Sequence, residues 1–229
     1  MSPVNSIARV AAALTLGAMA LGVPGPAEAA TGAKSYECYT SWEELYTTPF
    51  EIPVEVDVDL PTTASSGGAV SATAATVTVT APQELLEIAT DEGYTQFKVA
   101  TSNFAVNSTF GSTEGVHNLG SLASGWVAFG GTSDEDASAS GTIPAISLPS
   151  GWTGTGAVRT PDNDNVTDPW YASGASSTET VAFTTTITVR EPVYLLGTQV
   201  GWSTQDVLFR CGTDGETVQG TTIESIAVS

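Results

Sequence analysis

Residues 50–60, FEIPVEVDVDL, alternate between apolar and other side chains over eleven positions. Successive side chains of a β-strand point to opposite faces, so this period of two predicts a strand with one buried face and one acidic face. Pro53 has no backbone N–H to donate, which favours an edge strand or a bulge. We expect the acidic face to be solvated and to discourage pairing with another chain.

Most of the remaining chain consists of shorter segments that also have the residue pattern of β-strands. Further strand candidates are separated by Gly, Ser, Thr, Pro and Asp clusters, and they lie at 68–81, 94–101, 103–110, 125–130, 142–148, 180–190, 205–211 and 221–229. Only residues 81–93, APQELLEIATDEG, predict a helix, with Pro82 suited to its first position. The pattern predicts an all-β fold, an antiparallel β-sandwich of about 8–10 strands with one short helix.

The first 29 residues have the three-part organisation of a secretory signal peptide. Arg9 is followed by an apolar run of 14 residues, Val10–Val23, and by a small-residue site at 27–29. This run is shorter than the roughly 20 residues of a membrane-spanning helix, although a retained anchor is the alternative. We expect a secreted, extracellular protein with one domain over 30–229, in which 130–171 form a loop or insert.

Two cysteines, Cys38 and Cys211, lie 173 positions apart. Paired thiols usually oxidise outside the cytoplasm, so we expect a disulfide that ties the first strand to the penultimate one within a single domain. Closing so long a loop is worth roughly 5 kcal/mol in the chain-entropy model. Two free buried thiols are the alternative. Neither cysteine has the C-x-x-C or metal-ligand spacing of a reactive or metal-binding site.

The formal net charge is −19, from 25 acidic and 6 basic residues. Such a field repels phosphate backbones and anionic membranes, which excludes nucleic acid as a partner. Cationic proteins, divalent cations and neutral sugars remain compatible with it, and solubility alone is the plainest explanation.

No catalytic residue can be assigned from the sequence. His117 is the single histidine, it lies between glycines, and the chain has no Gly-x-Ser-x-Gly motif, so we expect an exposed loop residue and a protein that is not an enzyme. A glycoside hydrolase that uses a carboxylate pair is the less favoured alternative, because two of the many acids would suffice.

Acidic side chains gather in the segment TPDNDNVTDPW, with Asp162, Asp164 and Asp168 inside seven residues. Clustered oxygen ligands on a loop are what calcium prefers, so these three aspartates are the candidate calcium ligands. The run departs from the EF-hand pattern, and a turn before Pro169 is the alternative. No other cofactor is predicted.

Three tryptophans, Trp152, Trp170 and Trp202, lie in turn-like surroundings. If they are exposed together, they would form an apolar platform that stacks on sugar rings. The alternative is that each tryptophan closes an end of the sandwich core.

The stretches SYEC, PVEVDVDLPTT, VTVTAPQELL and the closing VLFRCGTDGETVQGTTIESIAVS together resemble uncharacterised secreted β-sandwich proteins of actinomycetes. The resemblance covers most of the chain after the leader and is one of layout and composition. It implies an immunoglobulin-like (Ig-like) sandwich, an end-to-end disulfide and no catalytic residues to carry over.

The sequence thus predicts a secreted, non-enzymatic binding or adaptor subunit that acts by protein–protein contacts in an extracellular or cell-surface assembly. An adaptor of a multi-subunit, umbrella-type toxin particle is one such assembly. Edge strands would allow docking by strand addition. The alternative is a carbohydrate- or cell-wall-binding module that uses the three tryptophans.

Overall fold

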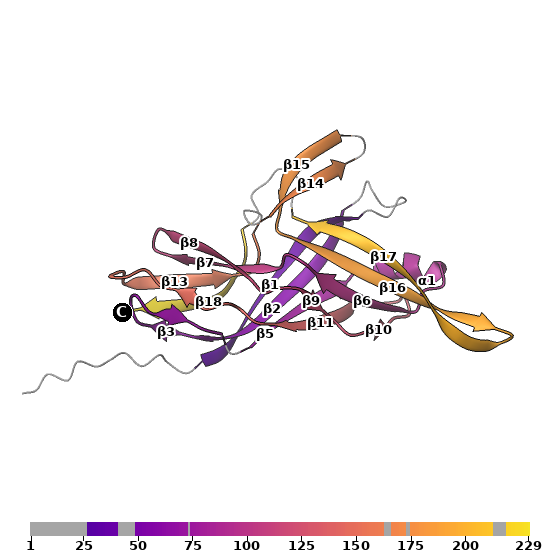
Figure 1. Cartoon of the computed structure of the whole chain (residues 1–229), viewed down its shortest axis with the longest axis horizontal. Coiled ribbons are helices and arrows are strands. Elements are labelled where there is room, and N and C mark those ends of the chain that lie inside the picture. The colour runs from indigo at the N-terminus through magenta and orange to yellow at the C-terminus, as the bar shows by residue number, and fades with distance from the viewer. Residues whose placement is uncertain (1–26, 41–48, 73, 163–165, 173–174, 213–218) are drawn as a thin grey trace, which may run out of the picture.

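The computed structural model describes residues 27–40, 49–72, 74–162, 166–172, 175–212 and 219–229. They form one helix, α1 (Gln83–Asp91), and a long series of strands (Figure 1). The strands are β1 (Ala27–Thr40), β2 (Phe50–Pro61), β3 (Thr63–Ala64), β4 (Ala69–Val70), β5 (Ala75–Ala81), β6 (Gln96–Thr101), β7 (Ala105–Phe110), β8 (Thr113–Asn118), β9 (Leu122–Ala123), β10 (Val127–Ala128), β11 (Glu135–Gly141), β12 (Ile146–Ser147), β13 (Gly154–Arg159), β14 (Val166–Ala172), β15 (Ala175–Val181), β16 (Phe183–Leu195), β17 (Thr198–Cys211) and β18 (Thr222–Val228).

Two sheets make up most of the described chain. The nine-stranded sheet has the order β10-β6-β16-β17-β1-β2-β5-β11, with β9 beside β6, and the five-stranded sheet has the order β3-β18-β13-β7-β8. The pairs β12-β4 and β14-β15 are separate. Of the described strand pairs, only β18 with β3 is parallel. The predicted all-β, antiparallel, sandwich-like fold is therefore confirmed, with more strands than expected because several are two-residue pairings.

The alternating segment forms β2, whose apolar side chains are buried as predicted. Its predicted edge position is wrong, because β2 lies between β1 and β5. Pairing with β5 begins at Val54, immediately after Pro53, so the missing N–H falls at the end of that ladder. Of the acids on the other face, Glu51, Glu55 and Asp57 are exposed and Asp59 is half-buried.

One continuous hydrophobic core connects the two large sheets. Tyr36 of β1 is buried in it, and its ring meets Phe183 edge-on at 5.1 Å. Its hydroxyl donates to the carbonyl oxygen of Pro161 at 2.7 Å and lies 3.1 Å from Thr160 Oγ1. Burial raises the pKa of Tyr36, because the phenolate would lose its hydration. Through these hydrogen bonds Tyr36 attaches the segment that follows β13 to β1.

The helix α1 lies where the sequence predicts it, with Leu85, Leu86 and Ala89 buried. Pro82 precedes it and offers no side-chain cap. The carboxylate of Asp134, from the segment before β11, instead accepts the N–H of Gln83 at 2.7 Å. An acceptor at a helix N-terminus satisfies an N–H that has no partner within the helix.

Residues 130–141 were expected to begin a loop or insert, yet Glu135–Gly141 form β11 along β5. The segment has no large apolar residue, but Ala137 is buried against the core. On the outer face Thr80 Oγ1 donates to Asp136 Oδ1 at 2.6 Å. Small residues suffice here, because alternate side chains of β11 are exposed to solvent.

Cys38 and Cys211 form the predicted disulfide. Both side chains are fully buried, and the two residues are direct partners in the β1–β17 ladder. Phe209 on the same face of β17 is also buried. Beyond the bridge, the final strand forms as β18 and joins the five-stranded sheet.

Candidate functional site

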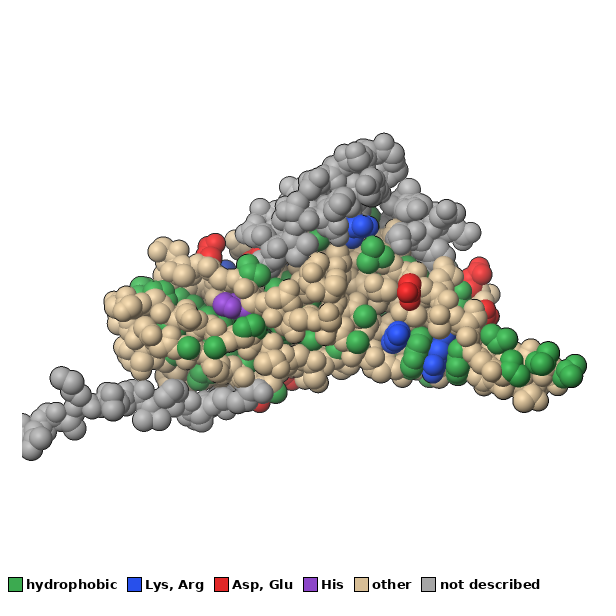
Figure 2. Space-filling model, in the orientation of Figure 1, with side chains coloured by type: hydrophobic (Ala, Val, Ile, Leu, Met, Phe, Trp, Pro, Cys, Tyr) green, Lys and Arg blue, Asp and Glu red, His purple; other side chains and the backbone are tan. Residues whose placement is uncertain are grey.

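The hairpin of β16 and β17 carries all but one of the exposed large hydrophobic side chains of the described chain. It projects from the body, and green side chains cover its end (Figures 1 and 2). Among the described residues, Val116 is the one exposed large hydrophobic side chain outside it. Those on the hairpin are Val193, Tyr194, Leu195, Leu196, Val200 and Trp202. Leu196 at the tip is 99% exposed. An apolar cluster of this kind usually marks an interaction site.

The hairpin extends beyond the described pairing of its two neighbouring strands, β6 and β1. The described pairing of β6 with β16 ends at Gln96 and Arg190, and that of β1 with β17 covers three residue pairs near Cys211. Beyond these points β16 and β17 continue to pair with each other as far as Leu195 and Thr198. Two residues, Leu196 and Gly197, close the turn.

A row of stacked cations and indole rings lies at the base of the hairpin. The Arg190 guanidinium lies over the rings of both Trp126 and Trp202, 4.0 Å from each centroid. Lys98 covers the Trp126 ring at 5.1 Å. Arg190 also donates from Nε to Gln96 Oε1 at 2.7 Å. In Figure 2 basic side chains alternate with apolar ones where the hairpin leaves the body.

This row stabilises the packing of the hairpin base, since each cation–π contact adds roughly 0.5–1 kcal/mol at an exposed site. The sequence predicted neither this row nor the outer parts of β16 and β17, since strands were expected in this region only at 180–190 and 205–211. The sequence feature that could have indicated the long hairpin is the uncharged stretch from Pro192 to Gln205, which has Leu-Leu-Gly near its middle.

The structure does not bring the three predicted tryptophans into one platform. Trp152 is half-buried before β13, where its ring meets Phe110 edge-on at 6.0 Å, while Trp202 lies on β17 in the other sheet. The side chain of Trp170 lies outside the described residues. One face of Trp202 is already covered by Arg190.

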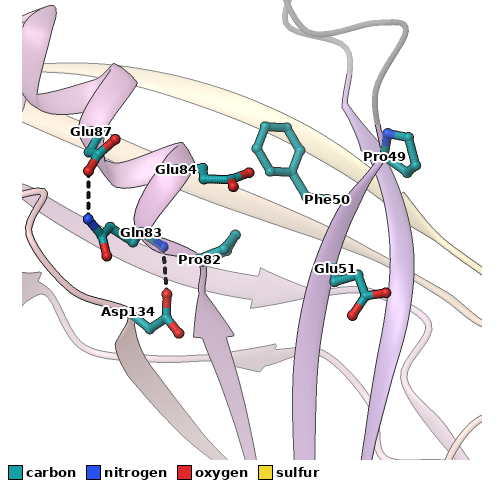
Figure 3. A pocket seen from close by; sticks show the side chains of 8 residues that line it. All are labelled: Pro49, Phe50, Glu51, Pro82, Gln83, Glu84, Glu87 and Asp134. Carbon is teal, nitrogen blue, oxygen red and sulfur yellow. Dashed lines mark hydrogen bonds between the residues drawn. The ribbon is translucent and has the colours of Figure 1, made fainter.

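An open cleft of about 620 Å³ lies between the start of β2 and the start of α1 (Figure 3). Its walls are Pro49, Phe50, Glu51, Pro82, Gln83, Glu84, Glu87 and Asp134. Gln83 engages two of the carboxylates, through its backbone to Asp134 and through its side chain to Glu87. Glu51 and Glu84 line the opposite walls. These acids would attract a cationic group.

His117 is not the loop residue that was expected. It lies on β8, half-buried, with its Nε2 2.8 Å from Ser108 Oγ of β7. Two strands in register bring the pair together, which the loop prediction could not anticipate. Ser108 is buried, and none of the hydrogen bonds among the described residues joins His117 to a carboxylate. The pair therefore lacks the oriented base and the accessible nucleophile of a catalytic triad.

Burial lowers the pKa of His117, which yields a test by pH. Its unfolded value is about 6.5, so below that pH protons bind the unfolded chain more readily than the folded one, and the free energy of unfolding falls as the pH falls. We expect the His117→Gln variant to lose less stability than the unsubstituted protein between pH 7.5 and 5.5, measured by urea denaturation. Equal losses in the two proteins would contradict this assignment.

Of the three predicted calcium ligands, Asp162 is half-buried near Tyr36, whereas Asp164 and the side chain of Asp168 lie outside the described residues. Within the described part of the chain, no three His, Cys, Asp or Glu side chains gather as a metal site. The same residues include no helix long and apolar enough to cross a membrane.

Comparison with known proteins identifies a family. Residues 35–188, more than half of the chain, match the model described as "Family of unknown function (DUF6801)". The match begins within β1 and ends within β16, so the hairpin tip and Cys211 lie beyond it. No curated protein and no solved structure matches the chain. On the extent of this match, the chain belongs to the family of unknown function DUF6801.

Proposed function

We propose that this chain is a secreted, non-enzymatic binding or adaptor protein that attaches to another extracellular component through the β16–β17 hairpin. The observation that carries the proposal is the hairpin's projecting apolar end, where Tyr194 and Leu195 are each 62% exposed and Leu196 is 99% exposed. Monomeric proteins seldom expose such residues together without a partner. The predicted leader, most of which lies outside the described residues, would direct the chain out of the cell.

The rest of the molecule would serve as a stable body from which the hairpin projects. The disulfide and the continuous core hold the body together. The cation–π row joins the hairpin base to Trp126 of the body, which restrains the base of the arm. An adaptor needs this combination, because a rigid attachment arm loses little conformational entropy on binding.

Site-specific photocrosslinking tests the proposal. A photoreactive phenylalanine analogue is placed at Leu196 in the full chain, and the protein is irradiated in the culture of the cells that make it. The matched control carries the same analogue at Val116, the exposed apolar residue on β8. We expect a discrete adduct from position 196 that position 116 does not give. If both positions give no protein adduct, or the same adducts, the hairpin is not a protein-docking arm.

A further inference from the structure

The turn at the end of the hairpin has a residue that its geometry disfavours. Leu196 and Gly197 form a two-residue loop in which both φ angles are positive, 52° and 79°. Loops of this kind strongly prefer Asn-Gly, because asparagine and glycine tolerate the left-handed region and a leucine does not. Among the described residues Leu196 is the single non-glycine with a positive φ.

Folding gains nothing visible from this leucine. Its side chain is 99% exposed, so no packing within the protein offsets the unfavourable backbone or the exposed apolar surface. A residue that is unfavourable for its backbone conformation, and that gains no packing in return, indicates a function at that position. What the leucine does provide is an apolar side chain at the outermost point of the arm.

The side chains along the hairpin change character with distance from the tip. Leu195 and Leu196 are outermost, and Tyr194 and Val200 follow them. Closer to the body lie Trp202 and, beneath it, the cations Arg190 and Lys98. Aliphatic, then aromatic, then basic is the order in which side chains meet a lipid surface, from the acyl region to the phosphates.

The dimensions agree with this order. Trp202 pairs with Pro192, and Leu195 lies three residues farther along β16, about 10 Å at the rise of a β-strand. Peptides that lie in a membrane interface bury their apolar face by about 5–10 Å. No charged residue lies between Pro192 and Gln205, and Glu191 and Asp206 bound this stretch. The uncharged end is therefore long enough to enter the interface, and the acids limit its depth.

We infer that the hairpin tip inserts into the surface of a zwitterionic, phosphate-bearing lipid layer. Charge favours this occupant: two of the chain's six Lys and Arg residues stand at the hairpin base, where lipid phosphates would lie. The net charge of −19 would oppose a strongly anionic surface. A lipid layer also accepts a convex apolar tip without a matching socket. This inference rests on the proposed function, since it names the partner of the same arm.

The test uses vesicles of pure phosphatidylcholine and the full chain with its disulfide formed. We expect the unsubstituted protein to float with the vesicles and Leu196→Asn to bind about tenfold less or weaker still. Because Asn-Gly suits this turn, the variant should unfold at the same or a higher urea concentration, so weaker binding would not reflect misfolding. The control Val116→Asn removes an exposed apolar side chain from β8 and should bind like the unsubstituted protein.

The lipid inference is overturned if the unsubstituted protein does not float, or if Leu196→Asn binds as well as Val116→Asn. Crosslinking then separates the two proposals. A protein adduct from position 196 together with no vesicle binding would make the hairpin a protein-docking arm, so the adaptor function would stand without the lipid. Absence of both would remove both proposals.

Discussion

Removing the disulfide in a Cys38→Ala/Cys211→Ala variant should lower the free energy of unfolding by on the order of 5 kcal/mol. The bridge spans 173 positions, so its loss frees most of the described chain in the unfolded state. Native domains have only about 5–15 kcal/mol of stability in total. The variant should therefore be marginally folded at best.

The position of the bridge gives its loss a structural consequence as well. In the nine-stranded sheet, β17 and β1 join the group β10-β6-β16-β17 to the group β1-β2-β5-β11. Among the described residues three pairs form this junction, and the disulfide joins one of them, Cys38 with Cys211. Without the bridge the sheet should open here first.

Guanidinium denaturation and amide hydrogen exchange measure the two effects. The oxidised protein, the same protein reduced under native conditions, and the double-alanine variant are compared. The amides of 38–40 and 209–211 should lose protection before those in the middle of β2. An unchanged midpoint in protein whose thiols titrate as fully reduced would contradict the prediction.

A second large effect is expected where Phe110 packs over Gly156. A Cβ at Gly156 would overlap the buried ring of Phe110 at Cδ1, Cε1 and Cγ. Phe110 is buried and also meets Trp152 edge-on, so it has little room to move. We expect Gly156→Ala to cost about 1–3 kcal/mol by overpacking and Phe110→Ala to cost about 3–5 kcal/mol by leaving a cavity.

A double-mutant cycle tests whether this contact is the cause. In the Phe110→Ala background, Gly156→Ala should cost much less, because the obstructing ring is gone. Gly201→Ala is the matched control, since Gly201 lies in β17 with open space around its Cβ position, and it should be neutral or slightly stabilising. Urea denaturation gives all the required values. Additive effects of the two substitutions would show that the ring does not determine the cost.

The elements that sequence reasoning predicted correctly have strong local signals. The alternation in β2 and the apolar face of α1 are both borne out by burial. These patterns depend only on the geometry of a single strand or helix, which side-chain periodicity reports directly. The disulfide followed from two cysteines and a predicted oxidising compartment, with no need to know the fold.

Errors arose where a strand depends on its neighbours. Pro53 suggested an edge, but its effect on pairing depends on where β5 begins to pair. The composition of Glu135–Gly141 suggests a loop, yet β5 supplies the hydrogen-bonding partner that makes it a strand. His117 was expected to be exposed, and its burial follows from the approach of Ser108 on β7.

The sequence alone determined the fold class, the helix α1 and the identity of the cysteine pair, because each rests on local periodicity or on the count of a rare residue. The tertiary structure decided which strands are central, where β16 and β17 leave their neighbours, and that Arg190 stacks between Trp126 and Trp202. Pairing and stacking join residues far apart in the chain, and no local pattern encodes their distance. The candidate site was therefore decided by the tertiary structure, since an apolar hairpin is an exposed arm only where no neighbouring strand pairs with it.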